Sequence, residues 1–62
     1  MEEYQTIKML NNNYHEDGIQ KGDIGCILEI YDKSSCEVEF SDENGITYAL
    51  QAIKSKDFEV IE

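Results

Sequence analysis

The sequence predicts a small all-β domain, and two observations indicate this class. Short apolar runs alternate with polar residues at a period of two, which is the spacing of strands that bury one face. Clusters of Gly, Asn, Asp and Ser separate these runs, and no segment predicts a helix of usual length. The 62 residues, of which 40% are hydrophobic, have the composition of one globular domain, and we expect that domain to span residues 1–62.

The first predicted elements are a strand and a long loop. Residues 4–10 form the strand, and the run of asparagines after it ends it, because asparagine favours turns. Residues 11–22 then form a loop that is long for so small a domain. We expect Ile19, the one aliphatic residue of this loop, to fold back onto the core together with Tyr14.

The second strand follows a glycine-rich turn, Gly18–Gly25, and is the most apolar run of the chain. Apolar residues on both faces of residues 24–31 predict a long, bent strand. Alternation predicts one shared inward face for Ile24, Cys26, Leu28 and Ile30. The glycines match no phosphate-binding loop, since no helix follows them, and they mark tightly bent backbone instead.

The turn at Asp42–Gly45 leaves two registers open for the hairpin that it closes. A two-residue loop would place Phe40 opposite Ala49. A type I turn with Gly45 in a left-handed conformation would place Phe40 opposite Tyr48, and this keeps the apolar side chains together. We predict the second register.

The remaining strands complete the expected architecture. They cover residues 36–40, 46–52 and 58–61, with Cys36, Val38 and Phe40 facing inward, and a polar corner at residues 54–57 predicts one 3₁₀ turn. Five short strands with a long first loop, two tight hairpins and this corner match a five-stranded SH3-like barrel. An OB-type barrel is less favoured, because it usually needs more residues and a helix between its third and fourth strands.

Four motifs resemble known families. They are the aromatic-led strand Tyr4 to Met9, the Gly-x-x-Lys-Gly-Asp-x-Gly turn of Gly18–Gly25, the strand Val38-Glu39-Phe40 and the acidic Asn-Gly hairpin of Asp42–Gly45. The turn resembles the KOW-type pattern, and over residues 4–61 the chain resembles a family of short bacterial proteins of unknown function. The resemblance implies an SH3-like barrel without established enzymatic activity, and a role as an antitoxin-like or immunity-type partner.

The charge of the chain predicts its class of partner. The net charge is −9, and the five basic residues are all lysines. Nucleic-acid affinity rests on neutralising phosphates with Lys and Arg, so direct nucleic-acid binding is not expected, and a basic protein partner is favoured. Glu2 and Glu3 stand where a signal peptide is basic, and no apolar run is long enough to span a membrane. We therefore expect a cytoplasmic monomer or weak homodimer without membrane contact.

No set of residues predicts catalysis, a cofactor or a metal. Cys26 and Cys36 are expected ~13 Å apart along the sheet at ~3.3 Å per residue, which is beyond the ~7 Å that a disulfide spans. Both thiols are expected to face inward, so the one histidine, His15, has no exposed thiol beside it. A zinc site needs three or four ligands at a recognisable spacing, which the sequence lacks. We predict that the protein is not an enzyme and holds no cofactor or metal.

Two groups of residues are predicted to bind a partner protein. The first has Glu29, Glu37 and Glu39 on one outward strand face, with Asp42 and Glu43 at its end. The second comprises Tyr14, His15, Glu16 and Asp17 of the long loop. Like charges side by side destabilise a sheet, and a cationic partner relieves this repulsion. The alternative is a plain solvated acidic face and an ordinary polar loop.

These observations lead to three functional hypotheses. The first is a non-catalytic acidic module that inhibits a basic, nuclease-like protein. The second is a KOW-like nucleic-acid-associated adaptor, or an acidic mimic of nucleic acid. The third is an accessory subunit of an enzyme or a purely structural domain.

Overall fold

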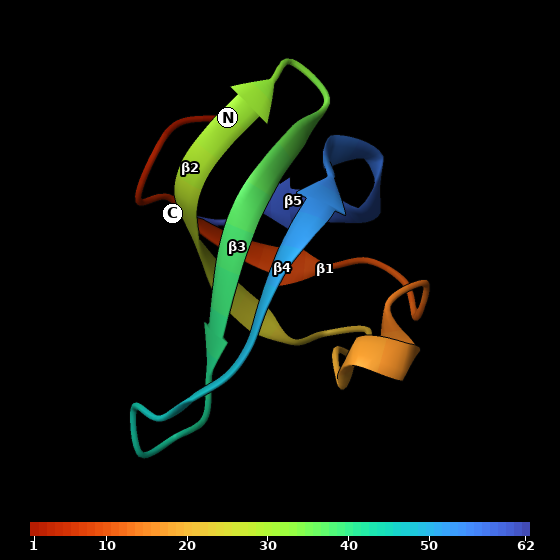
Figure 1. Cartoon of the computed structure of the whole chain (residues 1–62), viewed down its shortest axis with the longest axis vertical. Coiled ribbons are helices and arrows are strands. Elements are labelled where there is room, and N and C mark those ends of the chain that lie inside the picture. The colour runs from red at the N-terminus through yellow and green to blue at the C-terminus, as the bar shows by residue number, and fades with distance from the viewer.

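The computed structural model of the chain describes all 62 residues and consists of five strands and two short 3₁₀ helices (Figure 1). The strands are β1 (Thr6–Met9), β2 (Ile24–Asp32), β3 (Ser35–Ser41), β4 (Thr47–Lys54) and β5 (Phe58–Val60). The helices are η1 (His15–Asp17) in the long loop and η2 (Ser55–Asp57) before β5. Each helix has three residues, and neither is long or apolar enough to cross a bilayer.

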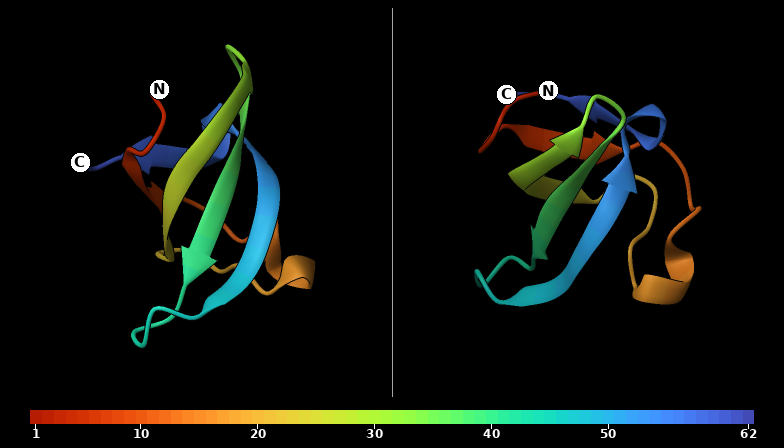
Figure 2. Two further views of the ribbon diagram at one scale, coloured as in Figure 1. Left: turned by 60° about the vertical axis from the view of Figure 1, so that its left-hand side comes forward. Right: turned by 45° about the horizontal axis from the view of Figure 1, so that its top comes forward.

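All neighbouring strands are antiparallel, in the order β4-β3-β2-β1-β5. The start of β2 pairs with β1 while nearly all of β2 pairs with β3, so the sheet bends around this strand. The bend carries β2, β3 and β4 over β1 and β5, and the core lies between (Figure 2). The predicted all-β class is confirmed. The curled sheet is compatible with the predicted SH3-like barrel, which stays open because β4 and β5 do not pair.

The long loop contributes to the core as the sequence predicts. Ile19 is fully buried, although it lies outside every strand, and Tyr14 packs against the core. The other buried apolar side chains come from the strands: Ile7, Met9, Ile27, Cys36, Val38, Phe40, Ile53 and Phe58. The predicted 3₁₀ turn at the polar corner is confirmed as η2.

The predicted inward face of β2 is wrong for its first half. Gly25 and Ile27 point inward, so Ile24 is 45% exposed and Cys26 is only half-buried on the outer side. The side chain of Val38 on β3 leaves room only for a glycine at this inward position, because a Cβ atom on Gly25 would lie 2.6 Å from Cγ1 of Val38. The register shifts after Ile27, and Ile30 therefore packs against the core as predicted.

The predicted register of the β3–β4 hairpin is also wrong, although its turn is right. Gly45 has the predicted left-handed conformation (φ 81°), and its N–H donates to the carbonyl of Asp42 at 2.9 Å. Beyond the turn the register shifts, because Tyr48 is an extra residue in β4, and Phe40 pairs with Ala49. The shift places Leu50 on the outer face, 54% exposed. The ring of Tyr48 still lies 6.3 Å from that of Phe40 between centroids.

Candidate protein-binding face

The outward side of β2, β3 and β4, here called the outer face, carries three glutamates close together. Glu29 of β2 lies directly opposite Glu37 of β3, and Glu39 follows two residues later on the same side of β3. We call Glu29, Glu37 and Glu39 the glutamate ridge. Figure 1 shows these strands in front of β1 and β5. Because Cys36, Val38 and Phe40 of β3 point into the core, the ridge lies on the side of the sheet away from it. The structure thus brings together the three strand residues of the first predicted group.

The glutamate ridge has hydrogen-bond donors but no ion pair. The Tyr31 hydroxyl donates to Oε1 of Glu37 at 2.9 Å, and the Thr47 hydroxyl donates to Oε2 of Glu39 at 2.7 Å. The hydrogen bond to Glu37 is the main cause that raises the pKa of Tyr31, and the negative charge of the ridge adds to it. The one ion pair of the chain joins Lys56 to Asp57, elsewhere in the molecule. The ridge carboxylates therefore repel one another without an ion pair to offset the repulsion.

Exposed apolar side chains surround the glutamate ridge. Leu50 lies opposite Glu39 on β4, and on β2 the half-buried Cys26 lies opposite the same glutamate. Tyr31 is 52% exposed. The outer face thus combines neighbouring carboxylates with exposed or half-buried apolar side chains.

The two acidic residues at the hairpin tip differ in what they do. The carboxylate of Asp42 accepts hydrogen bonds from the N–H groups of Asn44 and Ile46, at 2.8 and 3.0 Å, so it shapes the turn. Glu43 is exposed and forms no side-chain hydrogen bond. The tip lies at the end of the outer face, as the sequence predicts.

The four residues of the long loop that were predicted to bind a partner also differ in how exposed they are. His15, Glu16 and Asp17 form η1 and are exposed. Nδ1 of His15 lies 3.2 Å from the carbonyl oxygen of Asn12. Tyr14 is half-buried, and its hydroxyl is used within the molecule, so only the three residues of η1 stay open to a partner.

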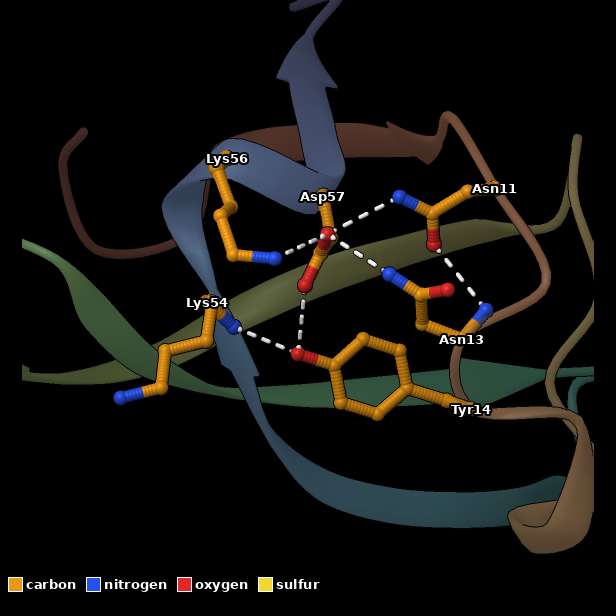
Figure 3. A network of polar contacts seen from close by, with 6 residues as sticks. All are labelled: Asn11, Asn13, Tyr14, Lys54, Lys56 and Asp57. Atoms are coloured by element: carbon orange, nitrogen blue, oxygen red, sulfur yellow. Dashed lines mark hydrogen bonds and ion pairs between the residues drawn. The ribbon is translucent and has the colours of Figure 1, made fainter.

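A polar network around Asp57 holds the long loop against the end of β4 (Figure 3). Oδ1 of Asp57 accepts from the side-chain amide of Asn11 at 2.9 Å, and Oδ2 accepts from the Tyr14 hydroxyl at 2.8 Å. That hydroxyl in turn accepts the N–H of Lys54 at 3.0 Å. The sequence did not predict this network, because Asn11 and Tyr14 lie 46 and 43 residues from Asp57 along the chain. The one local signal was the three asparagines, whose amides are natural donors to a carboxylate.

The network keeps Asp57 ionised inside the protein. Its side chain is only 4% exposed, and burial alone would raise the pKa of the carboxyl group. The hydrogen bonds from Asn11, Tyr14 and Lys56 and the charge of Lys56 outweigh burial, and they lower the pKa of Asp57 to about 2. Every buried side-chain nitrogen or oxygen of the chain has a hydrogen-bond partner, so the network leaves none of its buried atoms unpaired.

The thiols and carboxylates do not gather into a reactive or metal-binding group. Cys36 is buried, and desolvation raises the pKa of its thiol. Cys26 lies on the outer side of β2, contrary to the prediction that both thiols face inward. No three His, Cys, Asp or Glu side chains lie close enough together to hold a metal ion.

Comparison with known families gives one match. The model of a family described as a domain of unknown function, DUF4926, matches residues 3–60. No curated protein and no solved structure matches the chain. The matched range includes all five strands and the whole glutamate ridge.

Proposed function

The chain belongs to the DUF4926 family, a domain of unknown function, and from this premise we propose that it is a non-catalytic module that binds a basic protein through its outer face. In this proposal it acts in the bacterial cytoplasm as an antitoxin-like or immunity-type inhibitor of a cationic, nuclease-like protein. The observation that carries the proposal is the pairing of Glu29 with Glu37, two like charges held opposite each other without an ion pair.

The energetics of this pair support the proposal. Like charges directly opposite each other on a sheet destabilise it by up to about 1 kcal/mol. A 62-residue domain has little stability to spare, since it buries only about 60% of its unfolded surface. A cationic partner would remove this repulsion on binding, and the charge would also speed its association.

The surroundings of the ridge support a protein as the partner. Leu50 and Tyr31 are each more than half exposed beside the glutamates. Burying such apolar side chains around a desolvated ionic centre contributes affinity, and tyrosine is enriched where interfaces bind most strongly.

The test has two steps: finding a basic, nuclease-like protein encoded by a neighbouring open reading frame, and titrating it with this chain by calorimetry at 20 and 200 mM salt. We expect the double variant Glu29→Gln/Glu37→Gln to bind roughly tenfold more weakly at low salt, as for loss of two charged contacts of about 0.7 kcal/mol each. The matched control is Glu59→Gln/Glu62→Gln, which removes the same charge at the C-terminal end. The binding free energy of this control should fall by less than half as much as that of Glu29→Gln/Glu37→Gln.

Two outcomes would contradict the proposal. If the two proteins do not associate at 20 mM salt, the proposed function as an inhibitor of that basic protein is wrong. If both double variants weaken binding equally, net charge alone attracts the partner and the outer face is not its site. Competition by DNA for the same partner would instead favour the mimic of nucleic acid.

A further inference from the structure

A shallow depression lies next to Glu39 on the outer face. Its volume is about 250 Å³, and it lies where β1, β2 and β3 run side by side. The lining residues are Thr6, Ile24, Gly25, Cys26, Glu39 and Ser41. Gly25 lines the depression with its backbone, because a side chain at this position would point the other way, toward Val38 and Phe40 in the core.

Glu39 supplies the one charge of this depression. Its Oε2 atom accepts the Thr47 hydroxyl, while no protein donor lies within hydrogen-bond distance of Oε1. Lys8 is the nearest lysine by strand register, opposite Ile24 on β1, and it forms no ion pair with Glu39. The carboxylate therefore has capacity left for a cationic donor.

The walls of the depression are largely apolar. Ile24 is 45% exposed although it is a large aliphatic residue, and Cys26 is half-buried beside it. Lysine and arginine pair an aliphatic stem with a charged head, so they can cover such walls and still reach a carboxylate. The volume accommodates one such side chain.

We infer that this depression is an anchor subsite for a single lysine or arginine side chain of the basic partner, with its stem on Ile24 and Cys26 and its head on Glu39. This inference rests on the proposed function, and it adds which part of the outer face the partner's cation occupies. It assigns Glu39 a contact within the depression, in addition to the charged contacts of Glu29 and Glu37 in the proposed function.

Cys26 allows a test that needs no partner, because it lines the depression and carries a thiol. The full chain is equilibrated with cystamine or with the neutral bis(2-hydroxyethyl) disulfide. The Cys26 thiolate attacks one sulfur of the reagent, a mixed disulfide forms and one small thiol leaves. Cystamine thus leaves an aminoethyl cation in the depression, and peptide mass spectrometry separates the adduct from any on the buried Cys36.

The measured quantity is the equilibrium constant for exchange of Cys26 with cystamine, divided by that for exchange with bis(2-hydroxyethyl) disulfide. This ratio is then divided by the same ratio measured for N-acetylcysteine amide, a free thiol. We expect a preference for the cation of about two- to fivefold at 20 mM salt, the size of a partly exposed ion pair. Glu39→Gln should abolish this preference. Glu43→Gln, which removes the same charge at the hairpin tip, should retain most of it, and Lys8→Gln should not lower it.

Three results would overturn the subsite. They are no adduct at Cys26 with either reagent, no preference for the cation, and an equal preference in Glu39→Gln and in the parent chain. The last would show that the net charge of the whole molecule attracts the cation. Any of these results, together with weakened partner binding by Glu29→Gln/Glu37→Gln, removes the subsite and leaves the proposed function standing.

Discussion

At the scale of single residues, Gly25 sets the orientation of β2. A side chain there would meet Val38 and Phe40 at once, since an added Cβ atom would lie 2.6 Å from Cγ1 of Val38 and 2.9 Å from Cε2 of Phe40. The glycine leaves room for the side chains of Val38 and Phe40 against its backbone. Because Gly25 faces inward, its neighbours Ile24 and Cys26 face outward. The outward position of Ile24 and Cys26 therefore follows from one missing side chain in the core.

Gly25→Ala should destabilise the protein by about 1–3 kcal/mol, the usual cost of overpacking a core. Val38→Ala alone should cost about 2 kcal/mol, because it leaves a cavity. In the double variant the new methyl group occupies that cavity. The double variant should therefore lose at least 0.5 kcal/mol less unfolding free energy than the two single variants lose together, about the smallest coupling expected for contacting residues. Urea denaturation of the four chains gives this coupling. Strict additivity would show that Val38 is not what the methyl group meets.

At the scale of elements, the long loop is fixed at two points. Ile19 anchors its second half in the core, and Tyr14 joins its first half to Asp57 and to the backbone of Lys54. Between these points η1 is exposed with its three polar residues. A loop held in this way presents η1 in one position, which lowers the entropy lost when a partner binds.

The Asp57 network predicts a loss of stability in acid. The pKa of Asp57 is about 2 in the folded protein, below the ordinary value of 3.8. Because folding lowers this pKa, the stabilisation is fully present above about pH 4 and is lost as the pH falls toward 2. We expect the unfolding free energy of the parent chain to exceed that of Asp57→Asn by on the order of 1–2 kcal/mol near pH 6, and this difference to shrink between pH 4 and 2.

The control for this prediction is Glu59→Gln, an exposed carboxylate on β5 that forms no side-chain hydrogen bond. Its stability should follow that of the parent chain from pH 6 to pH 2. Chemical denaturation at each pH measures all three proteins. A difference between the parent chain and Asp57→Asn that stays constant down to pH 2 would contradict a lowered pKa for Asp57.

At the scale of the whole molecule, charge repulsion opposes folding. The net charge is −9, and the chain forms a single ion pair. The molecule measures 29 × 21 × 18 Å. At 10 mM salt the Debye length is about 30 Å, so nearly every pair of charges interacts, whereas at 1 M it is about 3 Å.

The melting temperature should therefore rise with sodium chloride. Screening of repulsion worth about 1 kcal/mol corresponds to an increase of roughly 4–8 °C for a domain of this size. The variant in which Glu2, Glu3, Glu59 and Glu62 are all glutamine carries four fewer negative charges and should gain less. Differential scanning calorimetry from 10 mM to 1 M salt checks both. A melting temperature that falls with salt would show that attractive pairs dominate.

Much of the fold follows from local patterns. Alternation of polar and apolar residues predicted the five strands, and the turn residues around Gly45 predicted the left-handed turn that the structure contains. The isolated Ile19 predicted that the long loop would reach the core. These features depend on neighbours in sequence, or on the simple need to bury an aliphatic side chain.

The candidate site was predictable only in part. The spacing of Glu37 and Glu39 placed both on one face, because side chains alternate along a strand. The depression beside Glu39 was not predictable, since it depends on Ile24 and Cys26 facing outward. A period of two fixes which residues share a face, but it does not say which of the two faces is buried.

The sequence by itself determined the all-β class, the strand positions, the turn at Gly45 and the acidic character of the surface. Only the tertiary structure decided the inward face of β2, the register beyond Tyr48 and the Asp57 network. The physical reason is that one residue of slip in a strand exchanges its two faces, and contacts between distant segments select the slip. Here those contacts are the approach of Val38 to Gly25 and the extra residue Tyr48 in β4.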